Sequence, residues 1–194
     1  MKFPSYDQTK RLMDFTLASA SLAAFSLPMA TIAVAIRATS KGPALHWSRR
    51  IGKDNCEFKM PKFRSMASNA PQLPTHLMTQ AQNFVTPLGR FLRKASLDEL
   101  PQLVSILKGD MSFVGPRPAL FNQDDLVALR TEKGVHRLVP GLTGWAQING
   151  RDELPIPVKV DLDAYYLEHR SLLLDLKIIA LTALKAVTAE GVRH

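Results

Sequence analysis

The sequence predicts a mixed α/β fold dominated by helices, in which short strands and irregular loops accompany an N-terminal helical membrane element. Two observations lead to this expectation. An uncharged apolar run fills residues 15–36, and the remaining chain lacks the regular alternation of strands and helices that builds a doubly wound sheet. The length of 194 residues suits one compact domain plus a membrane element. We therefore expect a membrane-anchoring segment at residues 1–41 and a cytosol-facing domain at residues 42–194.

The net charge indicates the kind of molecule that the protein binds, and the single cysteine limits the kinds of site that it can form. Lys and Arg total 25 against 17 Asp and Glu, and the net charge of +8 predicts a polyanionic partner: nucleic acid, an anionic membrane surface or phosphorylated substrates. Cys56 is the single cysteine, which excludes an internal disulfide and a cysteine metal cluster. This usage favours a reducing, cytosol-facing location. Residues 42–64 are basic and loop-like, and their interleaved aromatic rings also suit nucleic acid.

The apolar run has the length of a membrane segment. Phe15 to Ile36 gives 22 residues without a charged side chain, which is about what crosses a bilayer core. It is longer than the apolar core of a cleaved signal peptide, about 7–15 residues. Lys and Arg flank it on both sides, and such cations mark the cytoplasmic side of a membrane. A straight span cannot leave both of its ends on one side.

A helix that enters the membrane and returns satisfies both flanks. Pro28 lies near the middle of the run, where it removes one backbone hydrogen bond and frees the carbonyl of Ala24. Ser26 is placed to help satisfy this break. Ser26 and Pro28 are therefore the expected membrane break. An ordinary single span and a buried core helix are the alternatives that the sequence leaves open.

The segment at residues 90–100 places two carboxylates beside cations. Ser96 and Glu99 have the spacing of a capping box, so a plain helix start is one interpretation. Asp98 then lies in the first turn, where free N–H groups favour anions. A carboxylate that attacks a diphosphate needs cations, or Mg²⁺ held by a second acid, to offset charge repulsion. The residues that meet this demand are Asp98 and Glu99 beside Arg90, Arg93 and Lys94.

Two further segments offer contacts for a ligand. In residues 108–118, Pro116 and Pro118 fix the backbone around Arg117 and hold its guanidinium ready for a phosphate or a planar ring. A plain surface turn is the alternative. In residues 139–151, glycines permit close approach of the backbone to a ligand, and amides are available to read a base or a sugar. The side chains among these glycines are Trp145, Gln147 and Asn149.

Together these segments resemble the signature runs of the bacterial sugar transferase family. The matching runs are residues 96–103 (SLDELPQL), 108–118 (KGDMSFVGPRP) and 140–147 (PGLTGWAQ), in the order and spacing of the family. In length the chain resembles the minimal members, the monotopic polyprenyl-phosphate phosphoglycosyl transferases. The family's re-entrant helix breaks at a Ser-Pro pair, whereas this chain has Leu27 between the serine and the proline.

The resemblance implies an enzyme that transfers a sugar 1-phosphate from a UDP-sugar to a polyprenyl (undecaprenyl) phosphate and releases UMP. Asp98 would attack the β-phosphate and carry the sugar phosphate covalently. Glu99 and Asp98 would hold the required Mg²⁺, with Asp163 as a further ligand. Arg93 would bind the acceptor phosphate, and Arg117, in its Pro116–Pro118 turn, would bind the nucleotide. Arg151 would contact the sugar phosphate.

The resemblance also implies a location and a set of partners. The protein would lie in the bacterial inner (plasma) membrane, with residues 42–194 as the catalytic domain on the cytoplasmic face. Its partners would be the bilayer, the UDP-sugar and polyprenyl phosphate, with no nucleic acid expected. Residues 172–186 would lie at the interface as an amphipathic helix, with a core-packing helix as the alternative. A membrane-anchored nucleic-acid-binding module and a structural membrane adaptor are the alternative functions, and neither gives a role to Asp98 and Glu99.

Overall fold

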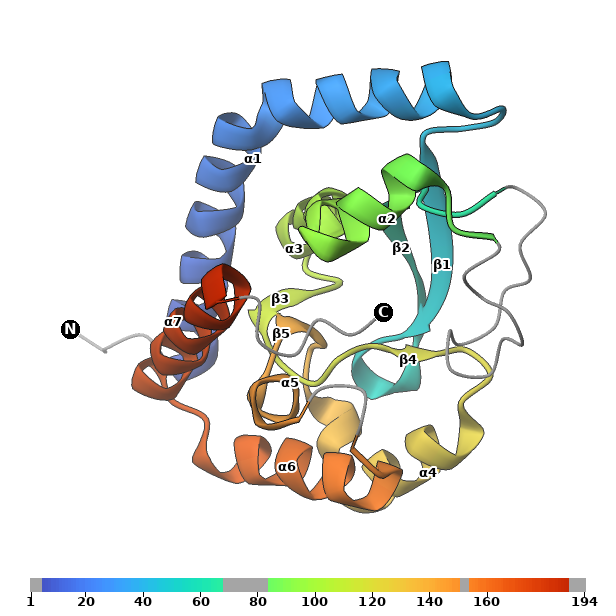
Figure 1. The fold of residues 1–194 in the computed structure, drawn as a ribbon. Coiled ribbons are helices and arrows are strands. Elements are labelled where there is room, and N and C mark those ends of the chain that lie inside the picture. The colour runs from blue at the N-terminus through green and yellow to red at the C-terminus, as the bar shows by residue number, and fades with distance from the viewer. Residues whose placement is uncertain (1–4, 68–83, 151–153, 189–194) are drawn as a thin grey trace.

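Helices surround two small sheets in the computed structural model, which describes residues 5–67, 84–150 and 154–188 (Figure 1). The helices are α1 (Tyr6–Thr39), α2 (Pro87–Lys94), α3 (Leu103–Lys108), α4 (Asp124–Glu132), α5 (Trp145–Asn149), α6 (Ile156–His169) and α7 (Leu172–Thr188). Short 3₁₀ segments are η1 (Lys53–Asn55), η4 (Leu97–Gln102) and η5 (Val135–Arg137). The strands are β1 (Leu45–Ile51), β2 (Glu57–Phe63), β3 (Ser112–Val114), β4 (Ala119–Leu120) and β5 (Gly141–Thr143). The predicted helix-dominated α/β class is confirmed.

The two sheets have different pairing. β1 and β2 form an antiparallel hairpin whose register runs from Leu45 opposite Phe63 to Ile51 opposite Glu57. β4 adds to the other edge of β1, which gives the order β2-β1-β4. β3 and β5 form a separate parallel pair. Residues 45–63 are therefore a hairpin, and the loop-like interpretation of this basic segment was wrong because its two halves pair along their whole length.

α1 is one helix of 34 residues with a marked change of direction. Its N-terminus has a capping box formed by Ser5 and Gln8. Figure 1 shows a first part beside α3 and α7 and a second part that crosses above α2. Pro28 lies inside the helix, and Ser26 Oγ donates to the carbonyl of Ala23 at 2.9 Å. Among the described residues, α1 is the helix that is long and apolar enough to cross a membrane.

The first part of α1 is tied to the segment that follows η4. The guanidinium of Arg11 donates to the carbonyls of Ile106 and Leu107, both at 2.6 Å, and so caps the C-terminus of α3. The carboxylate of Asp14, only 3% exposed, accepts from the backbone N–H of Phe113 at 3.0 Å. These contacts orient α3 and β3 relative to α1.

The far end of α1 is tied to the same globular body. The Arg64 guanidinium, just after β2, donates to the backbone carbonyls of Ser40 and Lys41 at 3.0 and 2.8 Å. Apolar packing agrees with these polar contacts. Ala18 packs with the cluster around Ile106, and a second cluster joins the following three residues: Ile36, Phe63 and Leu92. Both halves of α1 therefore share the hydrophobic core of the following domain.

α7 packs one face inward and leaves the other uncovered. Ile178 and Asp175 are fully buried, and the carboxylate of Asp175 accepts from Tyr166 at 2.6 Å and from Lys10 at 3.0 Å. The leucines of the outer face are exposed: Leu173, Leu176 and Leu184. The helix is amphipathic, with its inner face in the core.

Asp14→Ala should destabilise the protein by about 1–3 kcal/mol, because the Phe113 N–H would remain buried without its acceptor. The free energy of unfolding, measured with denaturant in detergent micelles, tests this expectation. Asp7→Ala is the matched control, since its ion pair with Arg170 involves an exposed carboxylate and should matter little. Asp14→Asn, which keeps an acceptor oxygen, should recover part of the loss. Equal stability of the Asp14→Ala and Asp7→Ala variants would contradict the role given to Asp14.

Candidate active site

Three segments distant in sequence meet at Glu99. Its Oε1 lies 2.7 Å from Lys62 Nζ and 3.5 Å from Arg117 Nη2. Lys62 belongs to β2, Glu99 to η4, and Arg117 to the turn between β3 and β4. We call Lys62, Glu99 and Arg117 the charge cluster. It brings the two predicted residues Glu99 and Arg117 together and adds a lysine that the sequence analysis did not assign.

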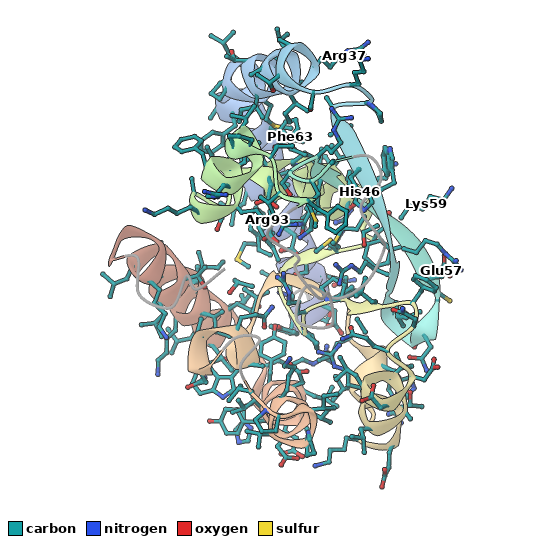
Figure 2. The ribbon with its side chains drawn as sticks, turned by 45° about the vertical axis from the view of Figure 1, so that its right-hand side comes forward. Arg37, His46, Glu57, Lys59, Phe63 and Arg93 are labelled. Atoms are coloured by element: carbon teal, nitrogen blue, oxygen red, sulfur yellow. The ribbon has the colours of Figure 1, made fainter. Side chains whose placement is uncertain are left out.

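Strand alternation explains why Lys62 reaches the charge cluster. Successive side chains of a strand face opposite sides of the sheet, so Met60 and Lys62 share one face. Met60 is buried in the core, and Lys62 extends beyond it to η4. Figure 2 shows Lys59 on the outer side of the hairpin, away from the centre of the molecule. The signal in the sequence was the alternation of polar and apolar residues at 57–60, which becomes informative once the hairpin is recognised.

Asp98 and Glu99 lie in the first turn of η4, as predicted, but the expected capping box is absent. Ser96 adopts a left-handed backbone with φ of 54°, and its side chain makes no capping hydrogen bond. The Glu99 side chain turns to Lys62 instead of returning to Ser96. The ion pair with Lys62 therefore outweighs the local capping interaction. Pro101 fits inside this short 3₁₀ segment, and α3 begins only at Leu103.

The two neighbouring carboxyls have opposite electrostatic environments. Partial burial opposes ionisation of Glu99, yet Lys62 and Arg117 lower its pKa to about 2. Asp98 is 8% exposed, and burial raises its pKa above the ordinary value, although Lys62 and Arg93 oppose the shift. Environments that separate the pKa values of adjacent acids allow them separate tasks. Glu99 stays ionised in its ion pairs, whereas Asp98 is a more basic carboxylate.

α2 brings Arg93 towards Asp98. Thr86 caps the helix by accepting from the N–H of Gly89 at 2.9 Å. Gly89 packs so closely on Ser65 that a Cβ there would lie 1.9 Å from the Ser65 carbonyl oxygen. This contact allows Arg93 Nε to donate to Ser65 Oγ at 2.8 Å. Figure 2 places Arg93 over the centre of the molecule, on the inner side of the hairpin.

A buried ion pair supports the turn that carries Arg117. The Arg130 guanidinium donates to Asp163 Oδ2 at 3.0 and 2.6 Å, and to the carbonyl of Arg117 at 2.8 Å. Arg50 donates to the carbonyl of Pro118 at 3.1 Å. The structure thus places the Asp163 carboxylate against Arg130, outside the charge cluster. Its predicted role as a metal ligand stays a prediction.

Close approach of two glycines positions the start of the same turn. A Cβ at Gly141 would lie 2.1 Å from the backbone nitrogen of Gly115. The Gly141 N–H donates to the carbonyl of Pro116 at 2.9 Å. A side chain at either glycine would push β3 and β5 apart and displace the turn. The glycines predicted to allow close approach to a ligand therefore first allow close approach of two strands.

A shallow, narrow cleft lies beside the charge cluster. It is lined by Arg50, Met60, Lys62, Glu99, Gln102, Arg117, Pro118 and Gly141. Three of these residues are cations, which suits an anionic ligand. The described residues contain no group of three or more acids, histidines or cysteines placed for a metal ion. Mg²⁺ commonly takes only one or two carboxylates together with substrate phosphates, and Asp98 and Glu99 fit that requirement.

Not every predicted residue belongs to this site. Ser26 and Pro28 lie in α1, and the predicted sugar-phosphate contact Arg151 lies outside the described residues. Asn149 uses its amide locally and donates to the carbonyl of Trp145 at 2.7 Å. Of the predicted residues, Glu99, Arg117 and Pro118 line the cleft, and Asp98 precedes Glu99 in η4.

Comparisons with known proteins show the family of the chain. The sequence model of the bacterial sugar transferase family matches residues 5–189. An uncharacterized sugar transferase of Bacillus subtilis is 39% identical over 187 residues, which cover 95% of this chain and 90% of that protein. A UDP-N-acetylgalactosamine-undecaprenyl-phosphate N-acetylgalactosaminephosphotransferase of Aeromonas hydrophila is 36% identical, with 98% of this chain and 46% of that protein covered. A UDP-glucose:undecaprenyl-phosphate glucose-1-phosphate transferase of Escherichia coli is 38% identical, with 91% of this chain and 39% of that protein covered. The chain thus spans less than half of the last two relatives.

Lys62→Met should lower the free energy of unfolding at pH 7 by roughly 2–3 kcal/mol, because Glu99 would lose its nearest partner. In the wild type, the folded-state pKa of about 2 is below the ordinary value of 4.5. Ionised Glu99 therefore stabilises the fold above pH 4.5, and this contribution is lost as the pH falls towards 2.

Denaturant unfolding between pH 7 and pH 3 measures both effects. The Lys62→Met variant should show a weaker decrease in stability over this range than the wild type. Lys59→Met is the matched control, because Lys59 is an exposed residue of the same strand, and this variant should differ from the wild type by less than about 0.5 kcal/mol. A Lys62→Met variant with wild-type stability and pH dependence would rule out the ion pair as a stabilising contact.

Proposed function

Because the chain belongs to the bacterial sugar transferase family, we propose that it transfers a sugar 1-phosphate from a UDP-sugar to undecaprenyl phosphate and releases UMP. The names of two relatives describe this type of reaction, with different sugars and the same acceptor. The observation that supports the proposal most directly is the pair of adjacent acids, Asp98 and Glu99, in opposite electrostatic environments beside Lys62, Arg93 and Arg117. A nucleic-acid-binding module or a membrane adaptor would have no use for this arrangement.

In the first step, a carboxylate oxygen of Asp98 attacks the β-phosphorus of the UDP-sugar. The bond from that phosphorus to the oxygen bridging the two phosphates breaks, and UMP leaves with the bond's electron pair. The product is an aspartyl phosphosugar. The raised pKa of Asp98 makes its carboxylate a better nucleophile. Lys62 and Arg117 would offset the negative charge of the diphosphate.

We propose Mg²⁺ as the cofactor, with Asp98 and Glu99 as its protein ligands. Lys62 and Arg117 both contact Oε1 of Glu99, and Oε2 takes part in neither contact. Bound Mg²⁺ would neutralise charge on the diphosphate. Asp163 is better suited to hold Arg130 and, through it, the carbonyl of Arg117.

In the second step, an oxygen of the acceptor phosphate attacks the same phosphorus and releases the Asp98 carboxylate. Arg93 is our candidate for binding the acceptor, because it lies near Asp98 at the end of α2. Phe91, on the same helix, is 60% exposed and provides an apolar contact for a polyprenyl chain. Arg151 remains our candidate for the sugar phosphate. Activity on a panel of UDP-sugars identifies the sugar that this chain transfers.

We also propose that α1 is re-entrant and that the catalytic domain lies on the cytoplasmic face of the bacterial inner membrane. Contacts from Arg11 and Asp14 at one end and Arg64 at the other tie both ends of α1 to one globular body. A straight span would place a bilayer between these ends. The bend of α1 and the proline within it support this proposal (Figure 1). The exposed leucines of α7 are suited to the membrane interface.

Asp98→Asn should reduce UMP release by about 1,000-fold or more, because the amide cannot act as the nucleophile. Glu99→Gln should reduce it by about 100-fold through loss of charge at the site. The assay uses detergent-solubilised protein, a panel of UDP-sugars, undecaprenyl phosphate and Mg²⁺, with EDTA added in a parallel series. Activity with one sugar that is lost with EDTA would identify both donor and cofactor. Full activity of the Asp98→Asn variant would exclude the covalent mechanism.

Accessibility to a membrane-impermeant maleimide tests the re-entrant helix. Cys56, between β1 and β2, is exposed and reports the side of the domain that follows α1. Asp7→Cys adds a second thiol at the N-terminal end of α1, and Cys56→Ser separates the two signals. Both thiols should react in spheroplasts only after permeabilisation. Pro28→Leu restores a backbone donor and favours a straight span, so part of the position-7 signal should become reactive from outside. Labelling of position 7 in intact spheroplasts without the Pro28 change would indicate a simple span.

A further inference from the structure

A buried amide without a hydrogen-bond partner lines the cleft of the charge cluster. Gln102 is 3% exposed, and its Nε2 makes no hydrogen bond to any described part of the chain. Burial of an unsatisfied N–H donor costs about 1–3 kcal/mol. Folded proteins rarely accept this cost without a reason. Here the unsatisfied amide lines a cleft together with three cationic side chains.

The backbone holds Gln102 beside the acids. It is the last residue of η4, three residues after Glu99, and side chains three residues apart share one face of a 3₁₀ helix. Its neighbours in sequence, Pro101 and Leu103, are buried, and their packing prevents the segment from rotating about its axis. The Gln102 side chain therefore faces the same cleft as Glu99, Lys62 and Arg117.

The chemistry of the cleft selects the ligand class. Gln102 Nε2 offers N–H donors, and the cationic groups Arg50, Lys62 and Arg117 also only donate. The acid of the cleft, Glu99, is already engaged by Lys62. A ligand that accepts several hydrogen bonds from neighbouring donors is an oxyanion, and a phosphate has enough acceptor oxygens for all of them.

We propose that Gln102 binds the substrate directly, with Nε2 donating a hydrogen bond to a non-bridging oxygen of the UDP-sugar diphosphate. This inference rests on the proposed function and adds a neutral donor to its charged residues. An amide lowers the energy of the bound diphosphate without adding a positive charge that would pair with Glu99. It also leaves the ionisation of Asp98 undisturbed.

Gln102→Met tests the proposal, since methionine has a similar length and lacks the N–H. We expect kcat/KM for the UDP-sugar to fall about 10- to 100-fold, the usual effect of one hydrogen bond to a charged group. The thermal midpoint of the free protein should stay the same or rise, because the variant buries no unsatisfied donor. A purely structural glutamine would behave in the opposite way.

Gln123→Met is the matched control. The Gln123 side chain satisfies a protein group, because its Oε1 accepts from the N–H of Leu120 at 2.8 Å. The same substitution there should lower the thermal midpoint and leave kcat/KM within about threefold of the wild type. The two glutamines should therefore show opposite patterns of activity and stability.

Two outcomes would overturn the proposal: a Gln102→Met variant with kcat/KM within threefold of the wild type, or one whose activity falls only together with its thermal midpoint. A separate binding measurement does not depend on turnover. Inorganic pyrophosphate should raise the thermal midpoint of the wild type more than that of the Gln102→Met variant, and equal shifts would also overturn the proposal. If the wild type releases no UMP from any UDP-sugar, the proposed function fails, and the pyrophosphate comparison still decides the role of Gln102.

Discussion

The ion pairs of Glu99 hold the candidate site together. A partly buried carboxylate is costly unless positive groups and hydrogen bonds compensate it, and Lys62 at 2.7 Å supplies most of this compensation. Because Lys62 lies in β2, the pair fastens the hairpin to η4. Arg117 adds the turn between β3 and β4. One carboxylate thus determines how three otherwise separate segments meet.

The surrounding structure keeps those cations in place. Arg130 and Asp163 form a buried pair that also binds the backbone carbonyl of Arg117. The contact between Gly115 and Gly141 sets the start of the same turn. α1 reaches this region as well, since Asp14 binds the backbone of Phe113, just before the turn. The membrane-type helix and the candidate site are therefore parts of one packed unit.

The cluster also explains how two adjacent acids acquire different properties. Lys62 and Arg117 neutralise Glu99, and Asp98 remains in a buried position where ionisation is less favourable. The difference arises from the direction in which each side chain points along η4. A residue with a reactive role can thus be buried next to one with an anchoring role, and the fold supplies the cations for both.

The sequence by itself determined the local features. The acids at the start of η4, the rigid turn around Arg117 and the proline within α1 follow from propensities and short spacings, and the motif runs indicated the family. Tertiary structure decided the remainder. The partner of Glu99 lies 37 positions away in the chain and the partner of Asp163 lies 33 positions away. The left-handed backbone of Ser96 accompanies the turn of Glu99 towards Lys62. A carboxylate binds whichever cation the fold brings nearest, and no local pattern specifies that distance. For this reason the sequence could identify the acids, whereas their partners and their pKa values became visible only in the folded chain.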